Sequence, residues 1–124
     1  MENKKNVHEH IIISLKFFMR EMFLLVKSPV FLLLTIMGNL LISIFSLIFY
    51  MIEKSTNSKL SSFIDALWWG FSTATTTGYG DITPVTHAGK FLGILLMLSG
   101  TAIFAMFTAL FAETILSSSR QHKK

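Results

Sequence analysis

Residues 73–84 read TATTTGYGDITP, a hydroxyl-rich run followed by two glycines one residue apart and a carboxylate. The stretch lies between two apolar segments without a charged residue, 30–50 and 91–112. The packing of an apolar core does not require this composition. Residues 73–84 are therefore the first candidate for a functional site.

The two flanking segments predict a membrane protein. They contain 21 and 22 residues, and a helix that rises ~1.5 Å per residue crosses a hydrocarbon core of ~30 Å at this length. The chain of 124 residues is 52% hydrophobic and has no cysteine, which excludes disulfides and thiol chemistry. No nucleophile–base pair, metal-ligating cluster or phosphate loop is visible, so we predict neither an enzyme nor an organic cofactor.

The expected fold class is an all-α membrane protein. We expect an interfacial helix over residues 1–27, an outer membrane helix over 28–52 and an outer loop over 53–61. A short helix over 62–75, an inner membrane helix over 88–117 and a tail over 118–124 follow. Ser28-Pro29 marks the first break, because proline is tolerated in the first turn of a helix but not in its interior.

The short helix begins at a capping-box pattern, Ser62 followed three residues later by Asp65. About 12–14 residues remain before Gly78, too few to span a bilayer, so this helix is expected to be re-entrant. Non-helical backbone at membrane depth is tolerated only where protein or a water-filled cavity surrounds it. A single chain of this size cannot enclose such a cavity, and the sequence therefore predicts an oligomer around a central pore.

The N-terminal segment is apolar with one narrow, mostly basic stripe. Wound at about 100° per residue, its charged side chains fall within about 60° of one another: Lys5, Glu9, Lys16, Arg20 and Lys27. Such a helix fits the cytoplasmic membrane interface, with the stripe towards anionic headgroups. The alternative is an ordinary helix packed against the rest of the protein.

The basic residues predict the orientation in the membrane. Eight lie outside the two spans and three between them, namely Lys4, Lys5, Lys16, Arg20, Lys27, Arg120, Lys123 and Lys124 against Lys54, Lys59 and Lys90. We therefore expect a multi-pass protein of the cell (plasma) membrane with both termini in the cytoplasm. This topology explains the isoelectric point of about 9.6 without a nucleic-acid partner.

The glycines of the central stretch suit the binding of a dehydrated cation. Successive carbonyls of an ordinary strand point to opposite sides, whereas glycine can take a positive φ and turn its carbonyl back. With Gly78 and Gly80 in that conformation, the carbonyls of residues 76–79 can face one axis. Stacked carbonyls replace the water shell of a monovalent cation without a fixed charge.

The residues TTTGYGD resemble the potassium-channel signature sequence, which has the form TVGYG. The longer stretch FIDALWWGFSTATTTGYGDITPVTHAGK, residues 63–90, is similar to the pore helix, filter and outer mouth of voltage-gated-type and related prokaryotic potassium channels. The resemblance covers residues 62–112 well, the first span by pattern and the first 27 residues weakly. It implies a pore domain over residues 28–117 with a pore helix at 62–75 and a selectivity filter at 76–80.

The resemblance also implies the site residues. In a fourfold homotetramer the filter residues line the K⁺ sites: Thr76, Thr77, Gly78, Tyr79 and Gly80. An aromatic cuff of Trp68, Trp69 and Tyr79 holds the filter open, and Asp81 accepts a hydrogen bond, expected from Trp68. Two positions depart from the family pattern. Thr77 stands where valine or isoleucine is commoner, and Ser72 where some members carry a carboxylate that pairs with the filter aspartate.

The inner span contains the candidate gating residues. Gly100 is either a hinge, as the resemblance implies, or a packing residue. A hydrophobic constriction can come from Phe104, Phe107 and Phe111. Four copies of Glu113 can ring the inner mouth, or each can pair with Lys16, Arg20 or Lys27.

The leading functional hypothesis is a potassium-selective channel with K⁺ bound in the filter. One alternative is a non-selective cation channel with a filter loosened at Thr77. Another is a non-conducting, membrane-anchored regulatory subunit. No arginine repeat typical of a voltage sensor precedes the pore, so we expect a minimal pore or a pore module of a larger protein.

Overall fold

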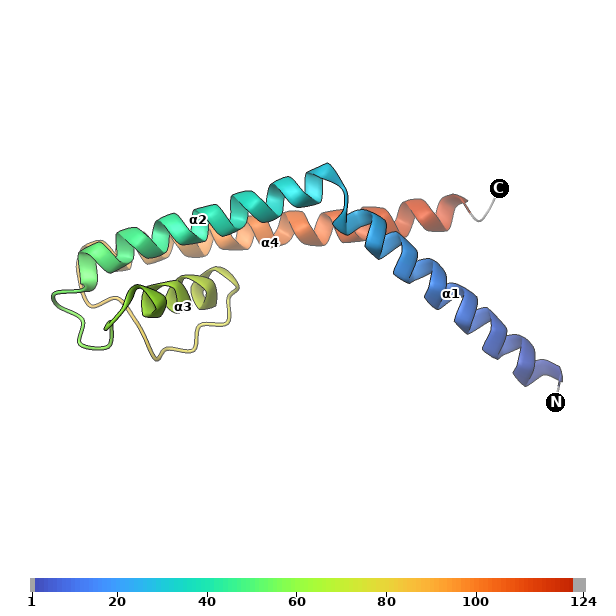
Figure 1. The fold of residues 1–124 in the computed structure, drawn as a ribbon, viewed down its shortest axis with the longest axis horizontal. Coiled ribbons are helices and arrows are strands. Elements are labelled where there is room, and N and C mark those ends of the chain that lie inside the picture. The colour runs from blue at the N-terminus through green and yellow to red at the C-terminus, as the bar shows by residue number, and fades with distance from the viewer. Residues whose placement is uncertain (1, 122–124) are drawn as a thin grey trace. The chain divides into compact units, whose positions relative to one another are not determined.

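The structure is a computed structural model that describes the backbone of residues 2–121 and the side chains of residues 8, 9 and 11–116. It contains four helices, α1 (Glu2–Val26), α2 (Pro29–Glu53), α3 (Phe63–Ala74) and α4 (His87–Gln121) (Figure 1). The expected all-helical fold with a short helix between two long ones is confirmed. Several basic side chains used for the orientation lie outside the described residues: Lys4, Lys5, Arg120, Lys123 and Lys124.

The chain divides into two compact units. One consists of Leu34–Met106 and contains most of α2, all of α3, the central stretch and the first half of α4. The other consists of Met1–Leu33 and Phe107–Lys124, and so contains α1 with the start of α2 and the end of α4.

Two helices have the length and apolarity of membrane spans, Pro29–Glu53 and His87–Leu116. Only 11% of the most apolar part of each helix is buried within the chain. Most of the apolar surface of the two helices is therefore exposed in the single chain, where water would penalise it. The protein is a membrane protein.

The local sequence explains where α2 begins. Pro29 occupies the first helical position, where its missing N–H would have no partner. Ser28 precedes it, and its side-chain oxygen accepts a hydrogen bond from the Phe31 N–H at 3.2 Å. Proline and serine together end α1 and start the first span.

The core of the unit Leu34–Met106 lies where α3 packs against α2 and α4. Its buried side chains come from all three helices and the outer loop: Phe49, Leu60, Ala66, Trp69, Ala74 and Leu96. Trp69 of α3 stacks on Phe49 of α2 with ring centroids 3.7 Å apart. This packing fixes α3 beside the two long helices (Figure 1).

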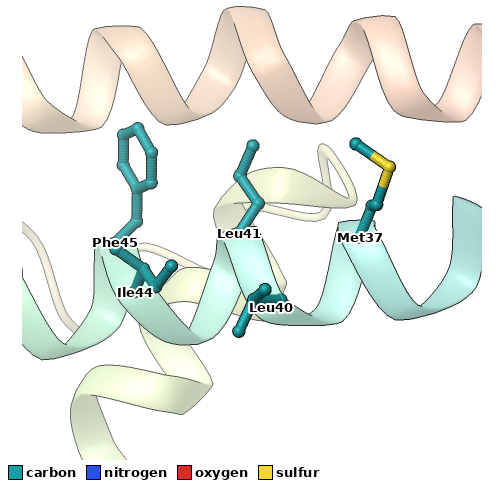
Figure 2. A pocket seen from close by; sticks show the side chains of 5 residues that line it. All are labelled: Met37, Leu40, Leu41, Ile44 and Phe45. Atoms are coloured by element: carbon teal, nitrogen blue, oxygen red, sulfur yellow. The ribbon is translucent and has the colours of Figure 1, made fainter.

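An apolar hollow of about 310 Å³ lies along α2. Its lining is wholly aliphatic, aromatic or thioether in character: Met37, Leu40, Leu41, Ile44 and Phe45. Figure 2 shows Met37, Leu41 and Phe45 pointing towards α4, whereas Leu40 and Ile44 point away from it. The hollow offers no polar group to an ion, so the candidate functional site is the central stretch.

Candidate functional site

The start of α3 is fixed by the predicted capping box. The Ser62 hydroxyl accepts from the Asp65 N–H at 3.4 Å, and the Asp65 carboxylate accepts from the Ser62 N–H at 2.7 Å. The carboxylate accepts from the Ser62 N–H, the Ser62 hydroxyl and the Ser61 N–H, and these bonds hold the pKa of Asp65 below its usual value. A carboxylate here also complements the partial positive charge of the helix N-terminus.

The stretch after α3 binds the end of that helix. The last carbonyls of a helix have no partner within it. Here the Thr75 N–H donates to the Phe71 carbonyl at 3.0 Å, the Thr76 N–H to Thr73 at 3.1 Å and the Gly78 N–H to Ser72 at 2.9 Å. These bonds anchor the predicted filter, residues 76–80, to the last turn of α3. We call these residues the filter strand.

The backbone of the filter strand alternates in handedness. Gly78 and Gly80 have φ of 54° and 76°, in the positive region that the sequence predicted for them. Thr76 also has a positive φ, 60°, which the sequence did not predict. Thr77 and Tyr79 lie between them with negative φ. This alternation turns every second peptide back, so that successive carbonyls can face the same side.

The left-handed Thr76 carries strain. A β-branched residue with φ of 60° is a rare exception in folded proteins, and such conformations cost about 1–3 kcal/mol. They persist where surrounding contacts hold them, and they cluster at functional sites. The strain at Thr76 therefore marks the inner end of the strand as part of the site.

Behind the strand, Trp68 contacts both Asp81 and Tyr79. The indole N–H of Trp68 donates to the Asp81 carboxylate at 2.8 Å, the hydrogen bond that the sequence led us to expect. This bond holds the pKa of Asp81 below its usual value. The Trp68 ring stacks on Tyr79 with centroids 5.0 Å apart and planes 14° from parallel. Trp68 thus joins α3 to the residues on both sides of Gly80.

The two remaining support residues act through other contacts within the chain. Trp69 is only 3% exposed and stacks on Phe49, so one chain contains a two-ring stack of Trp68 and Tyr79 rather than the expected three-ring cuff. Ser72 is buried, and its hydroxyl donates to the Trp69 carbonyl at 3.0 Å. Ser72 reaches the filter through its own carbonyl, which accepts from the Gly78 N–H.

A buried carboxylate, Glu53, anchors the outer end of the site. The sequence placed Glu53 at the start of the outer loop and not among the predicted site residues, whereas the structure has it as the last residue of α2. Its oxygens accept from the N–H groups of Val85 and Thr86, both at 2.9 Å, from the Thr86 hydroxyl at 2.6 Å and from the Asn57 amide at 3.1 Å. Asn57 also donates to the Thr83 carbonyl at 2.9 Å. Glu53 therefore ties the end of α2 to the segment that joins the filter to α4.

The contacts of Glu53 extend to the start of α4. The Thr86 hydroxyl accepts from the Gly89 N–H at 2.9 Å, as the cap of the helix that begins at His87. A Cβ on Gly89 would collide with the Glu53 carboxylate, so any other residue there would displace this carboxylate from its hydrogen-bond partners. An acid that ends an apolar span and a Thr-x-x-Gly before the next span are the sequence signals of this arrangement.

This geometry agrees with what comparison to known proteins finds. The family model described as "Ion channel" matches residues 37–117, about two thirds of the chain. The chain belongs to the ion channel family. The matched residues contain α3, the filter strand and most of both spans of the channel.

Two curated relatives share the central part of this ion channel. A potassium voltage-gated channel subfamily KQT member 4 from Homo sapiens is 45% identical over 69 residues, 56% of this chain and 10% of its own length. A voltage-gated potassium channel from Aeropyrum pernix is 47% identical over 58 residues, 46% of this chain and 20% of its own. The chain thus spans a tenth to a fifth of the length of these relatives.

Solved structures show the same fold. The crystal structure of a voltage-gated K⁺ channel pore domain in a closed state in lipid membranes is 38% identical. It aligns with a TM-score of 0.57 over 64% of this chain and 88% of that one. A second structure, described as a pore module, is 36% identical with a TM-score of 0.56 and 90% of its chain covered. This ion channel chain has the fold of a potassium-channel pore domain.

The inner helix of the channel places the five candidate gating residues in different surroundings. Gly100 packs against α3, where a Cβ would lie 2.5 Å from the Ala74 carbonyl oxygen and 2.7 Å from its Cα. Phe107 and Phe111 lie edge-on to Phe31 at centroid distances of 5.3 and 6.0 Å. Phe104 is 64% exposed.

Glu113 is exposed on the same helix. Within the part of the chain whose side chains are described, it forms no ion pair with Lys16, Arg20 or Lys27, and Arg20 lies 3.9 Å from Glu21 instead. The pairing of Glu113 with Lys16, Arg20 or Lys27, one of the two alternatives, is therefore not seen among these side chains, and the ring at the inner mouth stays a prediction. The close approach of Gly100 to Ala74 explains why a glycine stands at this position. A hinge at Gly100 stays a prediction.

Proposed function

We propose that this chain conducts K⁺ passively through a homotetrameric pore whose selectivity filter is Thr76–Gly80. The observation that carries the proposal is the alternation of φ along the filter strand, positive at Thr76, Gly78 and Gly80. This backbone can line one axis with carbonyls that replace the water shell of a cation. The names of the relatives and structural neighbours, all potassium channels, support K⁺ as the ion.

Four chains complete the proposed site. The filter strand is exposed in one chain from Thr75 to Asp81, and non-helical backbone at membrane depth needs protein or a water-filled cavity around it. Around a fourfold axis the exposed strand would face three copies of itself. No cofactor other than the bound K⁺ is needed for this function.

In the proposed topology both termini lie in the cytoplasm of a cell whose plasma membrane contains the channel. The charged side chains described on α1 support an interfacial position, because Lys16, Arg20 and Lys27 are exposed and can approach anionic headgroups. The ring of Phe23 lies 4.3 Å from the Lys27 ammonium, which keeps one apolar and one cationic group together at the end of this helix.

The proposal is tested by flux through purified protein in liposomes under a K⁺ gradient, with Na⁺ as the competing ion and Ba²⁺ as a blocker. We expect K⁺-selective flux that Ba²⁺ blocks. Flux that follows Na⁺ as readily as K⁺ would decide for a non-selective channel.

One comparison favours a second candidate function. A delayed-rectifier potassium channel regulatory subunit from Mus musculus is 40% identical over 65 residues of this chain. A chain with this pore architecture could therefore modify the channels of other subunits without a current of its own. A purified homotetramer that stays silent in the flux assay, but alters flux when it is assembled with a conducting chain, would support this role.

A further inference from the structure

A polar side chain, Asn39, lies near the middle of the first membrane span. It is exposed in the single chain. One N–H of its carboxamide donates to the Thr35 carbonyl at 2.8 Å, and its backbone carbonyl accepts from the Ser43 hydroxyl at 2.8 Å. A carboxamide has two N–H donors and an oxygen that accepts. Within the part of the chain whose side chains are described, the second N–H and the side-chain oxygen of Asn39 have no partner.

Lipid tails cannot satisfy this carboxamide. An amide that enters hydrocarbon without a hydrogen bond is strongly disfavoured. A serine or threonine hydroxyl in a membrane helix can give its one proton to a carbonyl of its own helix, as Ser43 does. The carboxamide of Asn39 has a further donor, and such side chains in membrane helices bond to a neighbouring helix. A protein surface is therefore needed over Asn39.

Asn39 lies on the face of α2 that α3 covers further out. Ser46 follows Asn39 by seven residues, which is two turns along the same face. A Cβ on Gly70 of α3 would collide with the Ser46 oxygen, so α3 lies directly against this face. The open surface at Asn39 continues the surface that α3 buries.

The glycine contacts give the level at which α3 ends. Gly38 packs against Ile103 of α4, and Gly100, three residues before Ile103, packs against Ala74, the last residue of α3. At ~1.5 Å per residue, Ala74 lies about 4–5 Å further out than Gly38 and about 3 Å further out than Asn39. Because α3 has ended at the level of Asn39, its own chain leaves this face of α2 open there.

The inner helix has a second open face, made of small side chains. Ala102 and Ala105 are both exposed. Wound at about 100° per residue, they lie about 140–160° around α4 from Gly100, and so point away from α3 of their own chain. Small side chains let another helix approach closely. A backbone carbonyl between them keeps a lone pair for a further N–H donor.

The two open faces lie at the same level. Asn39 follows Gly38 by one residue, Ala102 precedes Ile103 by one, and α2 and α4 run in opposite directions (Figure 1). Copies that are related by rotation about the membrane normal keep this level. Asn39 of one copy can therefore meet Ala102 of the next.

We propose that Asn39 donates a hydrogen bond to α4 of a second copy of this chain, at Ala102 and Ala105, and so joins neighbouring subunits within the membrane. The contact is continuous with the proposed pore, because it covers α2 just beyond the end of α3, where the filter strand begins. The inference deepens the proposed function and rests on its homotetramer, but not on the conduction of K⁺.

Cysteine pairs test this contact directly, because the chain has no cysteine of its own. Oxidation of the Asn39→Cys/Ala102→Cys protein in micelles should link chains covalently up to the tetramer, whereas neither single variant should link. Met37→Cys/Ala102→Cys is the matched control, because Met37 is 57% exposed and lies two residues from Asn39, about 160° around α2. If Asn39→Cys does not assemble, Ser43→Cys/Leu98→Cys reads the same contact about one turn further out.

A second variant tests the hydrogen bond itself. Asn39→Leu keeps a similar volume and removes the carboxamide. An interhelical hydrogen bond in a membrane favours association about threefold or more per contact. The concentration at which half of the tetramer dissociates varies as the cube root of the product over four contacts, so it should rise at least about fourfold in Asn39→Leu. Met37→Leu, which changes an apolar side chain at nearly the same level, should leave this concentration unchanged.

The possible outcomes separate this contact from the proposed conduction. A tetrameric wild type in which the Asn39–Ala102 pair links no better than the Met37–Ala102 pair would overturn the contact alone. A tetramer that Asn39→Leu leaves as stable as wild type, or makes more stable, would do the same and would indicate that lipid covers Asn39. Linked chains without ion flux would overturn conduction alone, and a wild type that forms no tetramer would overturn both.

Discussion

Replacing Glu53 by glutamine should destabilise the channel strongly, although the two side chains have the same shape. Glu53 is fully buried and accepts four hydrogen bonds, two on each oxygen. A side chain that accepts from four donors is held as a carboxylate. With its NH₂ group towards Val85 and Asn57, glutamine loses two hydrogen bonds. With its NH₂ group towards Thr86, it loses the bond from the Thr86 N–H, whereas the Thr86 hydroxyl can turn and accept. At about 1.5–3 kcal/mol for each hydrogen bond to a charged group, the loss is about 1.5–6 kcal/mol.

The expected loss can be measured by denaturant unfolding of the purified protein in micelles, followed by helical circular dichroism. Lys54→Gln is the matched control, because it changes a neighbouring charged residue that is exposed. Since Thr86 caps α4 and bonds to Glu53, amide exchange at the start of α4 should also become faster in Glu53→Gln. A Glu53→Gln protein as stable as the Lys54→Gln protein would refute the assignment of Glu53 as the anchor of the outer mouth.

Three further predictions follow from the same geometry. Gly100→Ala should lower the free energy of unfolding by about 1–3 kcal/mol, because the added Cβ meets the Ala74 backbone. Gly38→Ala should be neutral or stabilising, because the nearest neighbour of its Cβ is an Ile103 methyl at 3.4 Å. Unfolding of the two variants in micelles makes this comparison. Gly80→Ala should abolish selective flux, because φ of 76° is strained for alanine. A Cβ there meets nothing within 4 Å in the chain, so crowding would not explain the loss. Wild-type selectivity in this variant would disprove the requirement for a positive φ at residue 80. Trp68→Phe should raise the pKa of Asp81 towards its usual value, so that acid inactivation begins at a higher pH. The stabilisation by this depressed carboxyl is complete above the ordinary pKa of about 4 and is lost as the pH falls through the folded value. An unchanged acid midpoint in Trp68→Phe would show that the hydrogen bond does not govern Asp81.

Much of this site could be predicted because its residues act through local rules. The positive φ of Gly78 and Gly80 could be predicted because glycine is the one residue type that adopts it without penalty. The capping box of Ser62 and Asp65 follows from a spacing of three residues. The hydrogen bond between Trp68 and Asp81 spans thirteen residues and was expected from the resemblance alone.

The features that escaped prediction depend on tertiary contacts. Thr76 is left-handed against the preference of its residue type, and only its neighbours in the fold hold it so. Glu53 ends an apolar span, and from its position in the sequence it looks like a solvated residue. The N–H groups that bind its carboxylate belong to Val85 and Thr86, 32 and 33 residues further along the chain. The sequence left Gly100 as either a hinge or a packing residue, because it does not show that Ala74 lies against it.

Close packing of α3 joins the start of the filter to the inner helix. On one side, Gly70 of α3 faces Ser46 of α2 so closely that a Cβ would collide with the serine oxygen. On the other side, Gly100 of α4 lies against the backbone of Ala74, the last residue of α3 before the filter strand. Packed backbones have no flexible side chain between them to absorb a shift. Bending α4 at Gly100 must therefore either displace the start of the filter or separate Gly100 from Ala74. The same close contact would explain both a packing role and a hinge role of Gly100.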